Sequence, residues 1–411
     1  MRGHSPNLMT RRVSRRAVLG ALSAAVVGAA AACQNDDPNS SSSTPTPSPT
    51  PEPTLTPTQG VVASPVPGYA DPTKWSGRAL TIAVWGGPYE EAQRAAFFDP
   101  FSEATGATIQ TQTAEIGVLR EQVDAGEVIW DVLTLPMEEV LVLAREGYLQ
   151  PIDYKVVDRS ALYDDITLQY GVGVAYSSTV MLYPAGTTRA PQSWADFWDV
   201  TPPEPGVDLE PEQARVLRRS PVGTLEFALL ADGVPMEELY PLDVERAFAS
   251  LDRIRRNVIV WWEESKEPIE LVSSGLAAMA SGWNVRLQQF DIHDAVRIQW
   301  FGGMLTADAW VVPKGAPNAD VAMDFINFAT RAVPTANFSR LLPYGPVNRD
   351  AFNLLREDRK AILPSAPQNK AVQFTQNWNY WVDNREALSE RFENWLLSEE
   401  PETTPSSGEP R

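Results

Sequence analysis

The sequence predicts a large α/β protein built of two lobes. From Arg78 onward, short runs rich in Val, Ile and Leu alternate with longer segments in which apolar residues recur at helical spacing, the pattern of α/β folds. The segment from 78 to 398 exceeds the size that one hydrophobic core usually reaches, so we expect two lobes. Disulfides cannot contribute, because Cys33 is the only cysteine in the chain.

The first part of the folded region is expected to alternate strands and helices. The predicted strands are 79–85, 108–113 and 128–135, and the predicted helices are 89–105, 118–124 and 137–146. Glycines at 86, 87 and 147 end the first strand and the third helix. This order predicts a parallel sheet covered by helices, and ligands of such sheets bind at the carboxyl ends of the strands. Trp85 and the corner at 136–138 both lie at such ends.

The chain is expected to pass between the lobes near residues 174–178 and again near 300–305. Further helices are predicted at 217–230, 243–257, 267–280 and 319–329, and further strands at 258–260 and 304–312. The first lobe then comprises 78–174 and 303–350, and the second comprises 175–302 and 351–398. Residues 399–411 form a polar tail that we expect to be disordered.

The first 33 residues have the order of an export signal. Arginine pairs at 11–12 and 15–16 precede the uncharged stretch 17–32, which is too short to span a bilayer comfortably. Residues 14–19 (SRRAVL) resemble a twin-arginine export motif, and an ordinary Sec signal with extra arginines is the alternative. The stretch AAAC ending at Cys33 resembles a bacterial lipobox; the alternative is ordinary cleavage that leaves this cysteine incidental. We therefore expect an exported protein, periplasmic or at the cell surface, anchored through a lipid on Cys33.

Composition predicts a tether and an acidic surface. Residues 34–77 are rich in Ser, Thr and Pro and contain few apolar residues, so we expect them to be disordered and extended. The formal net charge is −19, and the first 33 residues carry five Arg and no acidic residue, so the remainder has a charge of −24 (−19 minus 5). This negative charge disfavours nucleic acid as a partner.

A series of motifs in the folded region resembles one known protein group. The motifs occur in this order: 85–89 (WGGPY), 100–106 (PFSEATG), 130–132 (WDV), 147–153 (GYLQPID), 193–198 (SWADFW), 275–283, 312–318 (VPKGAPN) and 344–348 (YGPVN). Together they resemble the spermidine/putrescine-binding protein group of bacterial extracellular solute-binding proteins, which serve ABC importers. The resemblance runs from about residue 79 to residue 395.

The resemblance implies a two-lobed periplasmic-binding-protein fold of type II-like form, with a hinge and a ligand cleft between the lobes. In polyamine binders of this group, aromatic rings sandwich the methylene chain and carboxylates pair with the ammonium groups. Trp85 and Tyr89 match the first aromatic pair of these proteins, and Trp283 matches an aromatic residue of the second lobe. Asp308 matches a carboxylate that receives an ammonium group.

The sequence departs from polyamine binders at some matching positions. The acidic pair that such proteins carry in the second lobe falls on Ser220 and Gly223, which cannot hold a cation. An expected tyrosine is replaced by Glu138, which either supplies negative charge from the other wall or reflects a change of ligand class. Trp261 and Trp262 follow the predicted strand 258–260, and strand alternation puts them on opposite faces. One of them is expected to add a ring to the cleft, with Trp262 favoured.

Each of these candidates also has a purely structural interpretation. Trp85 and Trp283 fit a hydrophobic core as well as a ligand-stacking role, and Tyr89 fits a surface contact. Asp308 in a strand can pair with an arginine or cap a turn instead of binding a ligand.

The predicted solute is a small amine, first a polyamine such as putrescine or spermidine. Amino acid-like solutes, opine-like solutes and sugars remain alternatives. The expected partners are an ABC transporter permease and the membrane; we expect a monomer without cofactor or metal. An exported glycoside hydrolase that uses paired carboxylates, for instance Glu138 with Glu264, is the alternative of another class. A Ser-His-Asp triad is disfavoured, because the chain contains only two histidines, His4 and His293, and His4 lies in the predicted export signal.

Overall fold

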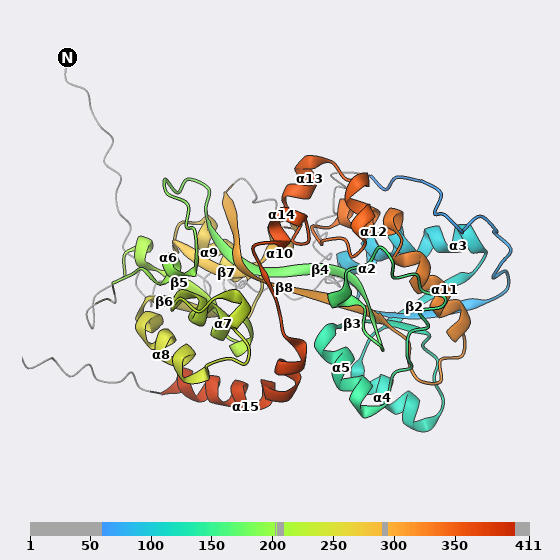
Figure 1. Ribbon diagram of the computed structural model, residues 1–411, viewed down its shortest axis with the longest axis horizontal. Coiled ribbons are helices and arrows are strands. Elements are labelled where there is room, and N and C mark those ends of the chain that lie inside the picture. Colours follow the sequence, from blue (N-terminus) through green and yellow to red (C-terminus); the bar gives the residue numbers. More distant parts are fainter. Residues whose placement is uncertain (1–59, 202, 204–208, 290–294, 399–411) are drawn as a thin grey trace, which may run out of the picture.

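The computed structural model describes residues 60–201, 203, 209–289 and 295–398. The export signal, Cys33, residues 34–59 and the tail 399–411 lie outside these residues, so the predictions made for them stay predictions. Two lobes lie end to end along the long axis of the molecule (Figure 1). Among the described residues, no helix has the length and the apolar character that a membrane span requires.

The first lobe is built on a mixed sheet. Its strands are β2 (Thr108–Thr113), β1 (Ala79–Val84) and β3 (Val132–Pro136), which are parallel, and β8 (Val296–Val311), which is antiparallel to β3. The parallel sheet predicted for the first three strands is confirmed, and β8 adds an antiparallel strand to it. The reason is that β8 returns from the other lobe and enters the sheet from the opposite end.

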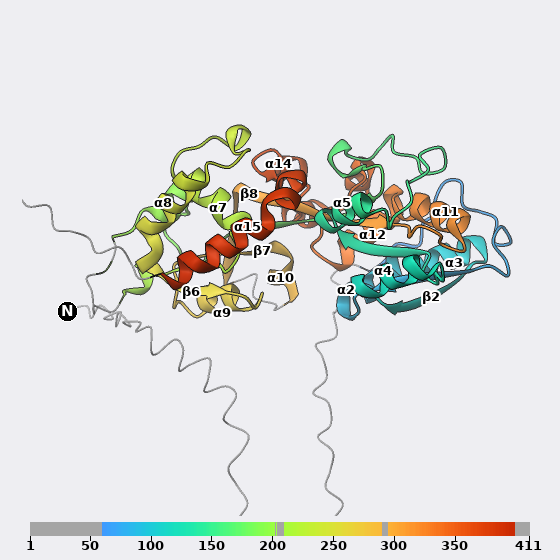
Figure 2. The same ribbon diagram turned by 90° about the horizontal axis from the view of Figure 1, so that it is seen from below.

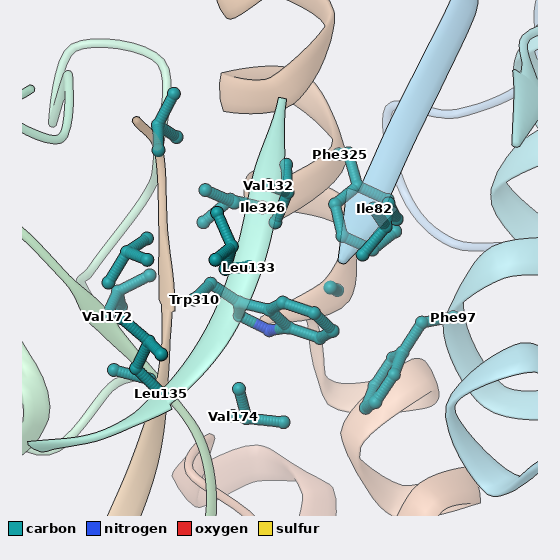
Figure 3. Close-up of a cluster of buried hydrophobic side chains, with 14 of the residues drawn as sticks. Ile82, Phe97, Val132, Leu133, Leu135, Val172, Val174, Trp310, Phe325 and Ile326 are labelled. Carbon is teal, nitrogen blue, oxygen red and sulfur yellow. The ribbon is translucent and has the colours of Figure 1, made fainter. Parts of the chain in front are cut away.

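Helices cover this sheet and enclose an aromatic core. They are α2 (Gly87–Gln93), a π-helical turn (Arg94–Phe98), α3 (Asp99–Thr105), α4 (Ile116–Ala125), α5 (Met137–Glu146), α11 (Ala319–Ala329) and α12 (Ala332–Leu341). The first three form one continuous helical segment, as predicted for 89–105. At the centre, the ring of Trp310 on β8 lies 5.6 Å from the ring of Phe97 and 5.2 Å from that of Phe325 (Figure 3). These contacts fix the helices against the strand that also carries Asp308.

Two long strands join the lobes. β4 (Val172–Pro184) and β8 pair antiparallel and run from one lobe into the other (Figure 1). They contain both predicted crossings, near 174–178 and 300–305. Because the two strands stay paired through the crossing, eight of the nine strands of the described chain form a single hydrogen-bonded series, β2-β1-β3-β8-β4-β7-β5-β6. The register shifts on β4 between Gly173 and Ala175 and between Thr179 and Met181, on either side of the crossing.

The second lobe continues the series with three short strands. These are β7 (Met279–Trp283), β5 (Arg215–Arg218) and β6 (Val258–Trp262), and β5 is parallel to both of its neighbours. The covering helices are α6 (Trp194–Trp198), α7 (Pro221–Ala231), α8 (Val244–Ile254), α9 (Glu267–Ser273), α10 (Asn284–Gln289) and α15 (Trp378–Leu397). The core contains Trp194 stacked on Phe227, with ring centroids 3.9 Å apart.

Two predicted helices of this lobe are partly wrong. The prediction 217–230 begins within strand β5, and the prediction 267–280 ends within strand β7. In both cases a glycine with positive φ stands where the conformation changes, Gly223 at 84° and Gly275 at 73°. The apolar residues on either side belong to different elements, although together they have helical spacing.

Short elements complete the chain. They are β9 (Phe374–Thr375), which pairs with β8, the short helices α13 (Glu357–Ala361) and α14 (Pro367–Lys370), and the 3₁₀ turns Asp164–Ile166, Pro211–Gln213, Met236–Glu238, Arg255–Asn257 and Arg349–Leu354.

The structure places two segments differently from the predicted boundaries. Residues 60–77, assigned to the tether, pack on α11: the Tyr69 hydroxyl donates to Asp324 Oδ1 at 3.0 Å, and Trp75 Nε1 donates to Asp324 Oδ2 at 2.7 Å. Residues 351–366, assigned to the second lobe, contribute apolar side chains to a cluster with Ala336 of α12 and so pack on the first lobe. The chain returns to the second lobe only after β9.

Candidate functional site

A cleft of about 520 Å³ lies between the two lobes, within the usual size range of small-molecule sites. The first lobe lines it with Trp85, Gly86, Pro88, Tyr89, Pro136, Asp308, Leu341, Leu342, Pro343 and Tyr344, and the second lobe with Trp283, Val285 and Arg286. Four of the six predicted site residues, Trp85, Tyr89, Trp283 and Asp308, therefore lie in one cleft.

Trp85 stands at the carboxyl end of β1, where the chain turns into α2. Gly86 and Gly87 both have positive φ, 80° and 65°, which lets the strand end abruptly. The indole nitrogen of Trp85 donates to the carbonyl oxygen of Thr134 at 2.8 Å, which fixes the ring at the cleft edge. The side chain is nevertheless 48% exposed, so a large apolar face remains available for a solute.

Tyr89 and Asp308 form a polar pair on the first-lobe wall. Tyr89 lies in the first turn of α2, and its hydroxyl donates to Asp308 Oδ2 at 3.1 Å. The Tyr89 ring meets the ring of Tyr344 edge-on, with centroids 5.2 Å apart. Asp308 lies on the hinge strand β8, opposite Pro136 of β3 and Ala175 of β4, and its side chain is partly accessible from the cleft.

Burial makes the carboxyl group of Asp308 unusually hard to ionise. Desolvation raises its pKa to about 6, although the hydrogen bond from Tyr89 opposes the shift. Burial, followed by the nearby charge of Asp308, also raises the pKa values of the Tyr89 and Tyr344 hydroxyls, so both stay protonated near neutral pH. When Asp308 is ionised, the Tyr89 hydroxyl stabilises its charge only in part, so a bound cation would stabilise the carboxylate further.

The second-lobe wall carries positive charge around Trp283. Trp283 ends β7, and Arg286 follows it in the first turn of α10. The guanidinium carbon of Arg286 lies 5.8 Å from the Trp283 ring centroid, and that of Arg218, at the end of β5, lies 5.1 Å from it. Arg218 also stacks at 5.5 Å on Trp262. Within the described chain, no carboxylate pairs with the Arg218 guanidinium, and burial lowers its pKa.

The other two predicted site residues do not line this cleft. Trp262 is fully buried behind Trp283, and its indole nitrogen donates to Ser281 Oγ at 3.2 Å. Glu138 instead accepts hydrogen bonds from Gln376 and Arg385, one on each of its carboxylate oxygens. Trp262 lies on the face of β6 that packs inward, a choice that strand alternation alone left open.

The remaining positions considered from the sequence have structural partners. Ser220 caps α7, accepting from Val222 N at 3.2 Å, and Gly223 N donates to the buried carboxylate of Glu226 at 2.9 Å. Glu264 is exposed in the loop after β6 and is not among the residues that line the cleft.

Sequence reasoning missed three residues of this region. Tyr344 is the aromatic residue of the motif YGPVN, so its ring was a signal that the sequence contains. Neither Arg218 nor Arg286 is among the site residues predicted from the sequence, and Arg286 has no local pattern that marks it. Strand pairing between distant segments brings Arg218 to Trp283, whereas Arg286 follows Trp283 closely in the chain.

Comparisons with known proteins agree with this geometry. Residues 96–373 match the family model described as bacterial extracellular solute-binding protein. The gamma-aminobutyric acid (GABA)-binding protein of Pseudomonas aeruginosa is 34% identical over 328 residues, which cover 77% of this chain and 91% of that protein. An ABC transporter substrate-binding protein from Bradyrhizobium japonicum is 33% identical with a TM-score of 0.70, over 78% of this chain and 100% of that chain. The Atu4243 GABA receptor is 31% identical with a TM-score of 0.68, over 80% and 100%.

The two-lobed fold, the interlobe cleft and these similarities describe the same kind of molecule, one that binds a small solute for an ABC transporter. The spermidine/putrescine group suggested by the motifs is narrower than these matches support, since two of the three relatives are named for GABA. The chain belongs to the bacterial extracellular solute-binding protein family.

Proposed function

We propose that this substrate-binding protein carries a small zwitterionic amino compound of the GABA class to its ABC importer. The observation that carries the proposal is the opposite charge of the two cleft walls. Asp308 on the first lobe and Arg286 on the second lobe both line the cleft. A solute with one ammonium and one carboxylate complements both walls at once.

The space between the charges is suited to a short apolar chain. The rings of Trp85, Tyr89 and Tyr344 line the first-lobe side, and the ring of Trp283 lines the second-lobe side. Aromatic faces pack well against methylene groups and also attract an ammonium group through their π electrons. The solute would therefore place its ammonium at Asp308, its methylenes among the rings and its carboxylate toward Arg286 and Arg218.

The same charges argue against a polyamine, the solute predicted first from the sequence. A diamine needs negative charge at both ends, and Asp308 is the one carboxylate among the described residues that line the cleft. The second ammonium would approach two arginines around Trp283, where like charge repels it. Ser220 and Gly223, which stand in place of an acidic pair, offer no compensation.

Export and anchoring are part of the same proposal. The motif at Cys33 supports lipidation, and the arginine pair at 15–16 supports twin-arginine export. A lipid-anchored receptor would stay near the permease while its tether lets the folded part move.

Isothermal titration with GABA, putrescine and butyrate tests the solute assignment. These compounds share a four-carbon chain and differ only in the end groups, so each comparison isolates one charge. We expect saturable binding of GABA, with putrescine and butyrate each at least about 100-fold weaker, because each lacks one of the two charge contacts. Tighter binding of putrescine than of GABA would contradict the proposal. So would binding of a neutral sugar or an opine in the absence of any response to GABA.

A further inference from the structure

The two lobes also meet at a second place, outside the cleft. Helices α5 and α15 lie side by side in both views (Figures 1 and 2). Glu138 on α5 accepts hydrogen bonds from Gln376 and from Arg385, and Arg145 Nη1 lies 2.5 Å from Asp383 Oδ1. We call these five residues the interlobe clamp.

The two ion pairs of the clamp differ in exposure. The side chain of Glu138 is only 13% exposed, and its partner Arg385 is 52% exposed, so this pair is partly shielded from water and salt. Burial lowers the pKa of Arg385. The Arg145–Asp383 pair is about half exposed on both sides and contributes less. Glu138 also stands in the first turn of α5, where a negative charge is favourable.

The clamp is connected to the cleft through the backbone. Glu138 lies two residues after Pro136, which lines the cleft and pairs with Asp308 across β3 and β8. Gln376 N donates to the carbonyl oxygen of Leu305 on β8 at 3.0 Å. Both ends of the clamp are therefore tied to the strand that forms the hinge.

The clamp and the cleft lie on different sides of the hinge strands. In Figure 1, α5 and the adjoining end of α15 lie below β4 and β8. In Figure 2, α2 and α10, which border the cleft, lie toward the lower edge of the molecule, below α5 and α15. When one lobe rotates relative to the other by bending at β4 and β8 so that the cleft walls approach, α5 of the first lobe therefore has to move relative to α15 of the second lobe.

We propose that the interlobe clamp holds the lobe arrangement of this structure and opposes the approach of the cleft walls. Glu138 and Arg385 then act as positioning residues that set solute affinity without touching the solute. The inference rests on the proposed function, in which the solute contacts both walls. Such a solute is held best when the walls approach, and the free energy needed to break the clamp is subtracted from its binding free energy.

Glu138→Gln and Arg385→Gln each remove the ion pair. We expect the Kd for GABA to fall by about 5- to 30-fold in each variant, the range of a moderate coupling between sites. The double variant should resemble the single variants, because all three lose the same pair. Glu146→Gln is the matched control: it breaks the 2.8 Å pair with Arg120 at the other end of α5, within the first lobe, and should leave the Kd unchanged.

The lobe arrangement itself is measured by spin-label distances. Labels on Glu121→Cys and Glu237→Cys, exposed residues of the two lobes, are specific in a Cys33→Ser background because no other cysteine exists. Without solute, Glu138→Gln should shift the distance distribution away from that of the wild type, toward the one that GABA produces, and Glu146→Gln should not. An unchanged distance distribution or a raised Kd for GABA in Glu138→Gln would refute the proposal that the clamp opposes the approach of the cleft walls. If the wild type does not bind GABA but Glu138→Gln still shifts the distances, the solute assignment fails and the clamp stands.

Discussion

Replacing Asp308 with Asn removes the one carboxylate among the described residues that line the cleft while keeping the shape of the side chain. At pH 8 the ammonium of the solute then loses its charged partner. For a partly buried pair this loss amounts to about 2 to 4 kcal/mol, so the Kd for GABA should rise by about 30- to 900-fold. Tyr89, which donates to Asp308 at 3.1 Å, can donate to the Asn oxygen instead, so the wall should keep its structure.

Because the pKa of Asp308 is raised, the Kd for the solute should depend on pH, and the direction of the change can be predicted. With a pKa of about 6 in the free protein, the ionised fraction falls from nearly all at pH 8 to about one tenth at pH 5. Only the ionised form pairs with an ammonium, so the apparent Kd of the wild type should rise about tenfold between these pH values. The hydroxyls of Tyr89 and Tyr344 stay protonated in this range, because burial raises their pKa values.

Titration calorimetry of the wild type and Asp308→Asn from pH 5 to pH 8 measures the loss of affinity in the variant and the pH dependence of the Kd. The variant should bind weakly and show little dependence on pH. In the absence of solute it should also melt at a higher temperature than the wild type at pH 8, and the gap should close toward pH 4. The reason is that an acid whose pKa is raised in the folded state loses stability as the pH rises from its unfolded to its folded pKa. A wild-type Kd that is flat between pH 5 and pH 8, or strong binding by the variant, would refute the role given to Asp308.

Three further expectations test other parts of the structure. Trp85→Ala should weaken GABA binding by about 1 to 2 kcal/mol in calorimetry through lost packing, and its melting temperature should stay near that of the wild type because the side chain is 48% exposed. Gly106→Ala should lower the free energy of unfolding more than Gly126→Ala does in denaturant titrations: both glycines have positive φ, but a Cβ at Gly106 would lie 2.2 Å from the carbonyl oxygen of Pro72, whereas Gly126 has open space. Equal losses would argue against the packing of residues 60–77 on the first lobe. Cys33→Ala should move the protein from the membrane fraction to the soluble fraction, and retention at wild-type level would contradict lipidation.

The sequence alone predicted the local elements of the first lobe closely. The strand 108–113 and the helices 137–146 and 319–329 have the bounds that were predicted. Each of these elements ends near a helix- or strand-ending residue or where the spacing of apolar residues changes. Gly147, for example, adopts the left-handed conformation that ends α5. Trp85, Tyr89 and Trp283, predicted from short motifs, and Asp308, predicted from the resemblance, lie together in the cleft.

The partners of polar side chains were decided by tertiary structure. Glu138 sits at the cleft corner in sequence, yet it is bound by Gln376 and Arg385, which lie more than 230 residues away along the chain. Hydrophobic periodicity reports which face of an element is buried and carries no information on which distant charge a carboxylate will meet. The same holds for Arg218, whose place beside Trp283 depends on the pairing of β5 with β7.

The sequence by itself determined that the chain is an α/β protein of two lobes, because strand and helix periods, glycine breaks and chain length are local properties. Tertiary structure decided the opposite charges of the cleft walls and the clamp between α5 and α15. Both depend on how β4 and β8 bring the lobes together, and a single wrong choice of face or register there would place every charged side chain elsewhere.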